Sequence, residues 1–111
     1  MKYKYYIASP FFNEAENIFY DECVKNLNCD IFEPKSAMMP KDADLKERHR
    51  VFIGNINAIN DSEEMLALIE YPDVGTAFEI GYAMGKNINI IPKYESFTNN
   101  PQIKNILEFI K

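Results

Sequence analysis

The stretch MLALIEYPDVGTAFEIGYAMG, residues 65–85, contains the two patterns that decide the fold. Its first five residues, Met65–Ile69, are uninterrupted apolar side chains and predict a strand. After a turn that contains Pro72, residues 76–84 predict a helix that ends at Gly85. A strand followed directly by a helix is the unit from which α/β domains are built.

Three more strands are predicted by short runs rich in apolar, β-branched or aromatic residues, each followed closely by a proline. These strands cover Tyr3–Ala8, Cys29–Glu33 and Ile88–Ile91. The polar stretch Lys35–Asp44 is the longest segment without a predicted element. Loops of this kind often contribute ligand contacts.

Three further helices separate these strands. The first begins at Asn13, which forms a capping-box pattern with Glu16, and continues through apolar residues at helical spacing to Leu27. The others cover Asp44–Asn60, which is amphipathic, and Ile103–Ile110. Strands separated by helices cannot pair as hairpins, so the sequence predicts a mostly parallel sheet of about four or five strands. The expected fold is a single α/β domain over residues 1–111, a three-layer sandwich of Rossmann or flavodoxin type.

The composition and net charge limit the kinds of molecule that the chain is expected to bind. The chain has 111 residues, of which 47% are hydrophobic, enough for one packed core. Its formal net charge of −5 argues against a nucleic-acid polymer, because such binding depends on Lys and Arg that neutralise phosphates. The sequence has no apolar run typical of a membrane span or a signal peptide, and a cytoplasmic location is expected. Cys23 and Cys29 are expected to be buried thiols.

Parallel sheets bind ligands outside the carboxyl ends of their strands. This rule selects three segments as the expected wall of a site: Ser9–Asn13, Glu33–Lys41 and Glu70–Gly75. Ser9 and Gly75 are therefore candidate substrate contacts. The only histidine, His49, lies in the charged run 46–50 and is expected to be a solvated helix residue, so no metal site is predicted.

Glu79 is the residue of greatest chemical interest. Its neighbours in the predicted helix are apolar: Phe78, Ile80, Tyr82, Ala83 and Met84. An ionised side chain in such surroundings is costly unless it is partnered, which makes it a candidate for function. A second interpretation fits the same pattern, because Thr76 and Glu79 have the spacing of a capping box and Asp73 could be a turn or N-cap residue. The pattern by itself leaves both interpretations open.

Three segments resemble the nucleoside 2-deoxyribosyltransferase family, and they occur in the family's order. They are YIASPFF (residues 6–12), NINAI (residues 55–59) and DVGTAFEIGYA (residues 73–83). The third segment is the most specific of the three, and the resemblance covers residues 6–91.

The resemblance implies roles for individual residues. Glu79 corresponds to the family's nucleophile, Asp73 to the aspartate that holds a sugar hydroxyl, and Tyr6 to the tyrosine beside the nucleophile. Phe12 corresponds to an aromatic residue that helps to hold the base. Asn55 stands where many members have an aspartate that assists proton delivery to the leaving base. An amide can form hydrogen bonds there but cannot donate an acidic proton.

The reaction implied is transfer of a 2-deoxyribosyl group between nucleobases through a covalent glycosyl-enzyme, with net retention. The implied partners are a 2'-deoxynucleoside, a free nucleobase and further copies of the chain, in a dimer-based oligomer of up to six subunits. The chemistry needs no metal or other cofactor.

The sequence leaves two other functions open. One is hydrolysis of the N-glycosidic bond, with water in place of the acceptor base. Family members that hydrolyse 2'-deoxynucleoside 5'-monophosphates carry phosphate-binding features that this sequence lacks, and Asp73 would repel a phosphate. The other is a non-catalytic domain that binds nucleotides or supports assembly.

Overall fold

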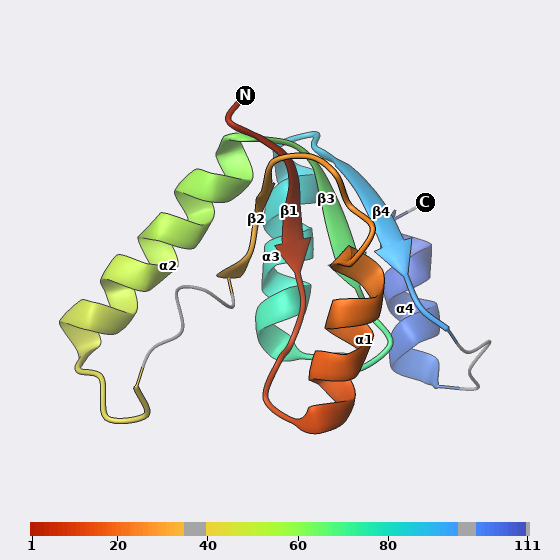
Figure 1. Ribbon diagram of the computed structural model, residues 1–111, viewed down its shortest axis with the longest axis horizontal. Helices are drawn as coiled ribbons and strands as arrows, with labels where there is room; N and C mark the ends of the chain where they lie inside the picture. The colour runs from red at the N-terminus through yellow and green to blue at the C-terminus, as the bar shows by residue number, and fades with distance from the viewer. Residues whose placement is uncertain (35–39, 96–99, 111) are drawn as a thin grey trace.

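The computed structural model describes residues 1–34, 40–95 and 100–110, so part of the predicted Lys35–Asp44 loop lies outside the described residues. Four strands and four helices alternate along the described chain (Figure 1). They are β1 (Tyr3–Ala8), α1 (Glu14–Val24), β2 (Ile31–Phe32), α2 (Leu45–Asn60), β3 (Ser62–Leu68), α3 (Val74–Gly85), β4 (Asn89–Lys93) and α4 (Pro101–Ile110).

The strands form one sheet in the order β2-β1-β3-β4, and all neighbouring pairs are parallel. β1 and β3 are therefore the central strands. In the register, Tyr6 of β1 lies opposite Phe32 of β2 on one side and Met65 of β3 on the other. The predicted parallel α/β architecture is confirmed.

Helices cover both faces of the sheet, which gives the three layers expected. α1 lies in front of the sheet in Figure 1, where Phe19 and Tyr20 pack with Ile7, Leu66 and Leu68. The other three helices cover the opposite face. Their buried residues join those of the strands in a larger core, which contains Tyr6, Ala8, Ala58, Ile59, Met65, Ala67, Ile69, Ile80, Ala83, Ile90 and Ile103.

Three helices begin with the same type of cap. Asn13, Asp44 and Asp73 each accept a hydrogen bond from the backbone N–H three residues later, at 2.9, 2.8 and 3.1 Å. Each such cap stabilises a helix by about 1 kcal/mol. Helix starts are thus fixed locally, by residues that the sequence places just before each apolar pattern.

The structure corrects several predicted bounds. β2 has two residues instead of five, so Cys29 precedes the strand and its thiol is exposed, while Cys23 is half-buried. β3 begins three residues early, at Ser62, whose buried hydroxyl donates to the carbonyl of Ala58 at 2.7 Å. β4 continues through Pro92, because an edge strand needs no N–H on its outer side.

No helix within the described residues combines the length and the apolar character that crossing a membrane requires.

Substitution of Ile59, which is fully buried between α2 and the sheet, should destabilise the fold. We expect Ile59→Ala to lower the free energy of unfolding by about 3 kcal/mol, through lost burial and the cavity left behind. Ile18 lies on α1 but is 56% exposed, so Ile18→Ala should change stability by less than about 0.5 kcal/mol. Urea denaturation measures both values, and equal losses in the two variants would contradict this assignment of the core.

Candidate active site

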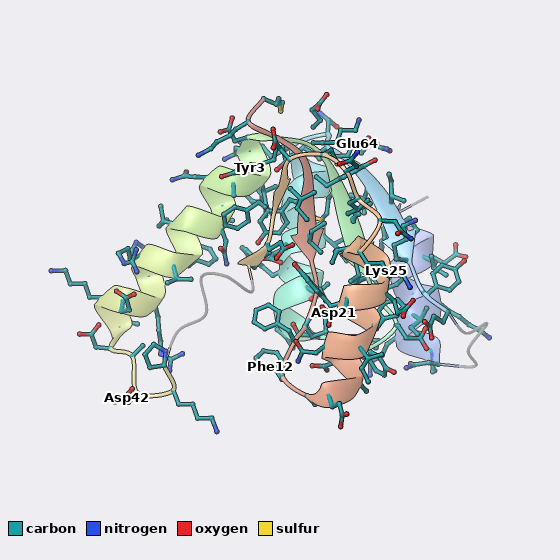
Figure 2. The ribbon with its side chains drawn as sticks, viewed as in Figure 1. Tyr3, Phe12, Asp21, Lys25, Asp42 and Glu64 are labelled. Atoms are coloured by element: carbon teal, nitrogen blue, oxygen red, sulfur yellow. The ribbon has the colours of Figure 1, made fainter. Side chains whose placement is uncertain are left out.

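The carboxyl ends of β1 and β3 form the place where a ligand is expected. The chain leaves β1 through α1 on one face and leaves β3 through α3 on the other, and the strands that follow lie on opposite sides of this central pair (Figure 1). Such a switch point opens a crevice between the two loops. Phe12 lies at this end of the sheet, whereas Tyr3 and Glu64 lie at the other (Figure 2).

The central contact of the site joins Tyr6 of β1 to Glu79 of α3. The Tyr6 hydroxyl donates a hydrogen bond to Oε2 of Glu79 at 2.6 Å, and the Tyr6 side chain is fully buried. Glu79 does not cap its own helix, because α3 begins one turn earlier than a Thr76 cap would require, at Asp73. The capping-box interpretation of Thr76 and Glu79 is therefore wrong, while Asp73 is an N-cap.

Burial raises the pKa of Glu79 to about 7. The hydrogen bond from Tyr6 opposes this effect by stabilising the carboxylate, and the negative charge of Asp73 adds to it. The pKa of Tyr6 is raised above its ordinary value, first by burial and then by the charge of Glu79. The tyrosine therefore remains a donor at neutral pH, beside a carboxylate that changes its charge there.

Asp73 is both a cap and a neighbour of the carboxylate. Its Oδ2 accepts from the backbone N–H of Thr76 at 3.1 Å and lies 3.4 Å from the Thr76 hydroxyl. Gly75 permits this arrangement, since a Cβ at that position would lie 3.2 Å from the same oxygen. The first turn of α3 thus holds one carboxylate close enough to affect the ionisation of another.

Glu79 opens onto a cleft of about 230 Å³ between α2 and α3. The residues that line it are Arg48, Val51, Phe52, Asn55, Ile56, Gly75, Phe78 and Glu79. The Phe52 and Phe78 rings bridge the two helices with centroids 5.5 Å apart. Asn55 lies on the same wall, and its Oδ1 is buried with no hydrogen-bond partner in the described part of the chain. The cleft therefore combines a carboxylate, an amide and aromatic surface.

The structure brings together most of the residues proposed from the sequence. Tyr6, Asp73 and Glu79 form one group, and Asn55 and Gly75 line the cleft beside it. Two candidates do not line the cleft. The Ser9 hydroxyl donates to the carbonyl of Pro10 at 2.8 Å, and Phe12 is 79% exposed, with its ring on Phe11.

Several residues at the site are not among the predicted ones, including the aromatic pair Phe52 and Phe78. Arg48 lies one turn before Phe52 on the cleft side of α2, and its guanidinium donates to the carbonyls of Ala43 and Lys41 at 3.0 and 2.9 Å. The spacing of seven residues between Arg48 and Asn55 places them on one helix face and could have indicated it. Phe32 stacks on Tyr6, and no sequence signal pointed to that contact.

Two other kinds of site do not fit the described residues as well as this cleft does. Among the described residues no group of three or more His, Cys, Asp or Glu side chains is arranged to hold a metal ion. A wider hollow of about 610 Å³ lies along α2, lined by Asp44, Lys46, Glu47, His49, Arg50 and Ile53. Glu79 does not line this hollow, so the smaller cleft is the candidate active site.

A known protein family matches most of the chain. The family model described as nucleoside 2-deoxyribosyltransferase matches residues 5–105. This range contains the Tyr6–Glu79 pair, Asp73 and the whole cleft. No curated protein sequence matches the chain significantly.

Solved structures that share the fold include a bacterial enzyme and a bacterial protein of undescribed activity. A 2-deoxyribosyltransferase from the psychrotolerant bacterium Bacillus psychrosaccharolyticus is similar with a TM-score of 0.71 and 24% identity, covering 86% of this chain and 76% of that enzyme. A conserved protein from Enterococcus faecalis is similar with a TM-score of 0.62 and 29% identity, covering 99% of this chain and 77% of that protein.

The raised pKa of Glu79 predicts a pH-dependent cost in stability. Between the ordinary pKa of 4.5 and the folded value of about 7, the folded protein holds a proton that the unfolded chain releases. Stability contributed by this residue therefore falls as the pH rises through that window. The variant Glu79→Gln has a side chain of the same shape that does not ionise. The difference in unfolding free energy between this variant and wild type should therefore grow from near zero below about pH 4 to roughly 3 kcal/mol above about pH 8, with the variant more stable.

Denaturant titrations at several pH values measure this difference. Glu14→Gln provides the control, because Glu14 is exposed in the first turn of α1 and its removal should produce no comparable widening. A constant difference between wild type and Glu79→Gln from pH 4 to pH 8 would contradict the buried carboxylate.

Proposed function

Because the chain belongs to the nucleoside 2-deoxyribosyltransferase family, we propose that it transfers a 2-deoxyribosyl group between nucleobases, with Glu79 as the nucleophile. The observation that carries this proposal is the Glu79 carboxylate itself. It is half-buried, is held by the Tyr6 hydroxyl at 2.6 Å and lines a cleft rather than capping its helix.

In the proposed reaction, Glu79 attacks the anomeric carbon of a 2'-deoxynucleoside. The bond from that carbon to the base breaks, the base leaves with the bonding electrons and takes up a proton from solvent, and the sugar remains bound to the carboxylate as an ester. A second base then attacks the same carbon through a ring nitrogen, loses the proton of that nitrogen to solvent, and releases Glu79 as a carboxylate. Two inversions give net retention of configuration.

Neighbouring groups support specific steps. Tyr6 holds the carboxylate through one oxygen and leaves the other for attack. Asp73 lies beside it, where its carboxylate can accept a hydrogen bond from a sugar hydroxyl and stabilise positive charge that develops on the sugar. Two carboxylates at this place oppose a phosphate, which favours an unphosphorylated nucleoside.

The base is proposed to lie along α2. Phe52 and Phe78 offer aromatic surface for stacking, and the Asn55 amide offers hydrogen bonds to a base edge. Phe12 lies on the loop after β1 at the same end of the sheet, and we propose that it also contacts the base (Figure 2). Ser9, on the same loop, completes the proposed contacts.

We further propose that the working enzyme is a homo-oligomer. The cleft of about 230 Å³ is smaller than pockets that enclose whole ligands of drug size, about 300 to 1,000 Å³, so one chain covers only part of a nucleoside. Apolar side chains on α3 and α4 are also exposed to solvent, including Val74 at 87% and Phe109 at 68%. Surface of this kind is typical of contacts between subunits.

Incubation with deoxyinosine and adenine tests the reaction. We expect deoxyadenosine and hypoxanthine to form, and brief exposure to a 2-fluoro-2-deoxynucleoside to leave a covalent sugar on Glu79, detectable by mass spectrometry of peptides. Glu79→Gln should lower transfer by at least about 10³-fold, because the nucleophile is lost, whereas Glu14→Gln should be fully active.

The same assay separates the alternatives. Free deoxyribose that accumulates at a rate unaffected by adenine would show a hydrolase. Retained ligand binding with no turnover in wild type, and no change on substitution of Glu79, would show a non-catalytic domain.

Asp73 can be tested apart from its capping role. Asn and Asp are about equally good N-caps, so Asp73→Asn should keep α3 and lower stability by less than about 1 kcal/mol. Loss of its charge should reduce transfer by about 10- to 100-fold and lower the pKa of Glu79. Asp44→Asn, which changes the N-cap of α2 outside the cleft, is the matched control. Unchanged transfer by Asp73→Asn would assign Asp73 to capping only.

A further inference from the structure

The Tyr6 ring lies in an aromatic stack that begins on a different strand. Phe32 of β2 lies nearly parallel to it, with ring centroids 5.4 Å apart and an interplanar angle of 13°. The Tyr3 ring packs against the same phenylalanine in a T-shaped arrangement, with centroids 5.4 Å apart at 64°. Phe32 thus contacts two tyrosines of β1, one of which bonds Glu79.

The backbone register explains why these rings meet. Phe32 and Tyr6 are direct partners across the parallel pair β1–β2, and β2 consists only of Ile31 and Phe32. Ile31 packs toward the α1 face, while Phe32 packs toward the core that contains Tyr6 and Ile80. This two-residue edge strand therefore contributes one residue to each face of the sheet. Phe32 is the residue on the face where Glu79 lies, and it packs against Tyr6.

Ring orientation matters because the hydroxyl lies at the far end of the tyrosine side chain. A small tilt of the ring displaces that oxygen more than any other atom of the residue. A hydrogen bond of 2.6 Å weakens steeply when its oxygen moves by a few tenths of an ångström or loses alignment. A flat neighbour packed against the ring face restricts this tilt.

We propose that Phe32 is a positioning residue for Glu79, which acts by holding the Tyr6 ring in the plane that aims its hydroxyl at the carboxylate. The expected effect of Phe32 on turnover rests on the proposed function. Its expected effect on the protonation of Glu79 does not depend on that function. Within residues 1–34, 40–95 and 100–110, the titratable groups that act on Glu79 are Tyr6 from β1 and Asp73 from the start of α3, and Arg48 of α2 lines the same cleft. Phe32 carries no charge, so its influence must pass through contacts.

A double-mutant cycle tests the proposal on the free protein. The pKa of Glu79 is measured by ¹³C NMR in wild type, Phe32→Leu, Tyr6→Phe and the double variant, with the Glu79 resonance identified by its absence from Glu79→Gln. Tyr6→Phe should raise this pKa by about 1, because it removes the bond that stabilises the carboxylate. Phe32→Leu should raise it by about half as much, and should add nothing in the Tyr6→Phe background.

Two controls separate positioning from general packing. Phe32→Tyr keeps a ring in the stack and should restore the wild-type pKa. Phe19→Leu alters a buried aromatic residue on the opposite face of the sheet, where it contacts Tyr71, and should cost stability without moving the pKa of Glu79. Phe32→Met serves as a second variant without a ring if Phe32→Leu does not fold.

Two results would overturn the proposal. One is an unchanged pKa of Glu79 in folded Phe32→Leu or Phe32→Met. The other is an equal change in the presence and absence of the Tyr6 hydroxyl, which would mean that Phe32 acts only by excluding water. Turnover is a separate readout: Phe32→Leu should lower kcat about 10-fold with little change in KM. A wild-type protein without transferase activity would refute the proposed function and leave the NMR result to decide the role of Phe32.

Discussion

The hydrogen bond between Tyr6 and Glu79 is the constraint on which the site depends. A carboxylate on an apolar helix face cannot be buried without a partner, and the partner here comes from a central strand 73 residues earlier in the chain. Packing of Ile80 and Ala83 in the core sets which face of α3 meets the sheet, and the bond holds the carboxylate of that helix against β1. Burial and the hydrogen bond act on the pKa of Glu79 in opposite directions, and burial has the larger effect.

Capping of α3 by Asp73 frees Glu79 for this contact. The cap and the carboxylate lie within the first two turns of one helix, yet they use different partners, Thr76 for the cap and Tyr6 for the carboxylate. Had the helix begun at Thr76, Glu79 would have bonded its own backbone and the cleft would lack its acid. Gly75 belongs to the same arrangement, because a side chain there would press on the Asp73 carboxylate.

Much of the fold could be predicted because the signals are local. The bounds of β1, the caps at Asn13 and Asp44 and the parallel sheet follow from apolar runs, prolines and capping residues within a few positions of one another. The site is less predictable from the sequence, because its contacts join segments that are far apart in the chain. Periodicity marked Glu79 as unusual but could not decide between Thr76 and Tyr6, and the family resemblance supplied Tyr6. Phe32 was missed because its importance depends on the register of a two-residue strand, which no local pattern records.

The position of Asp73 explains how a site can contain two carboxylates that repel each other. In the free protein the charge of Asp73 helps to keep Glu79 protonated, which is unfavourable for a nucleophile. On the proposed reaction path, positive charge develops on the sugar as the base departs, and both carboxylates then face a cation. The two carboxylates still repel each other, but each now attracts the cationic sugar, and this attraction is absent in the ground state. Only interactions that are stronger in the transition state accelerate a reaction. Tyr6 stabilises the ionised form of Glu79 in the ground state and so opposes the effect of Asp73 on its pKa. The tyrosine thus favours the ionised nucleophile, and the aspartate favours the cationic transition state.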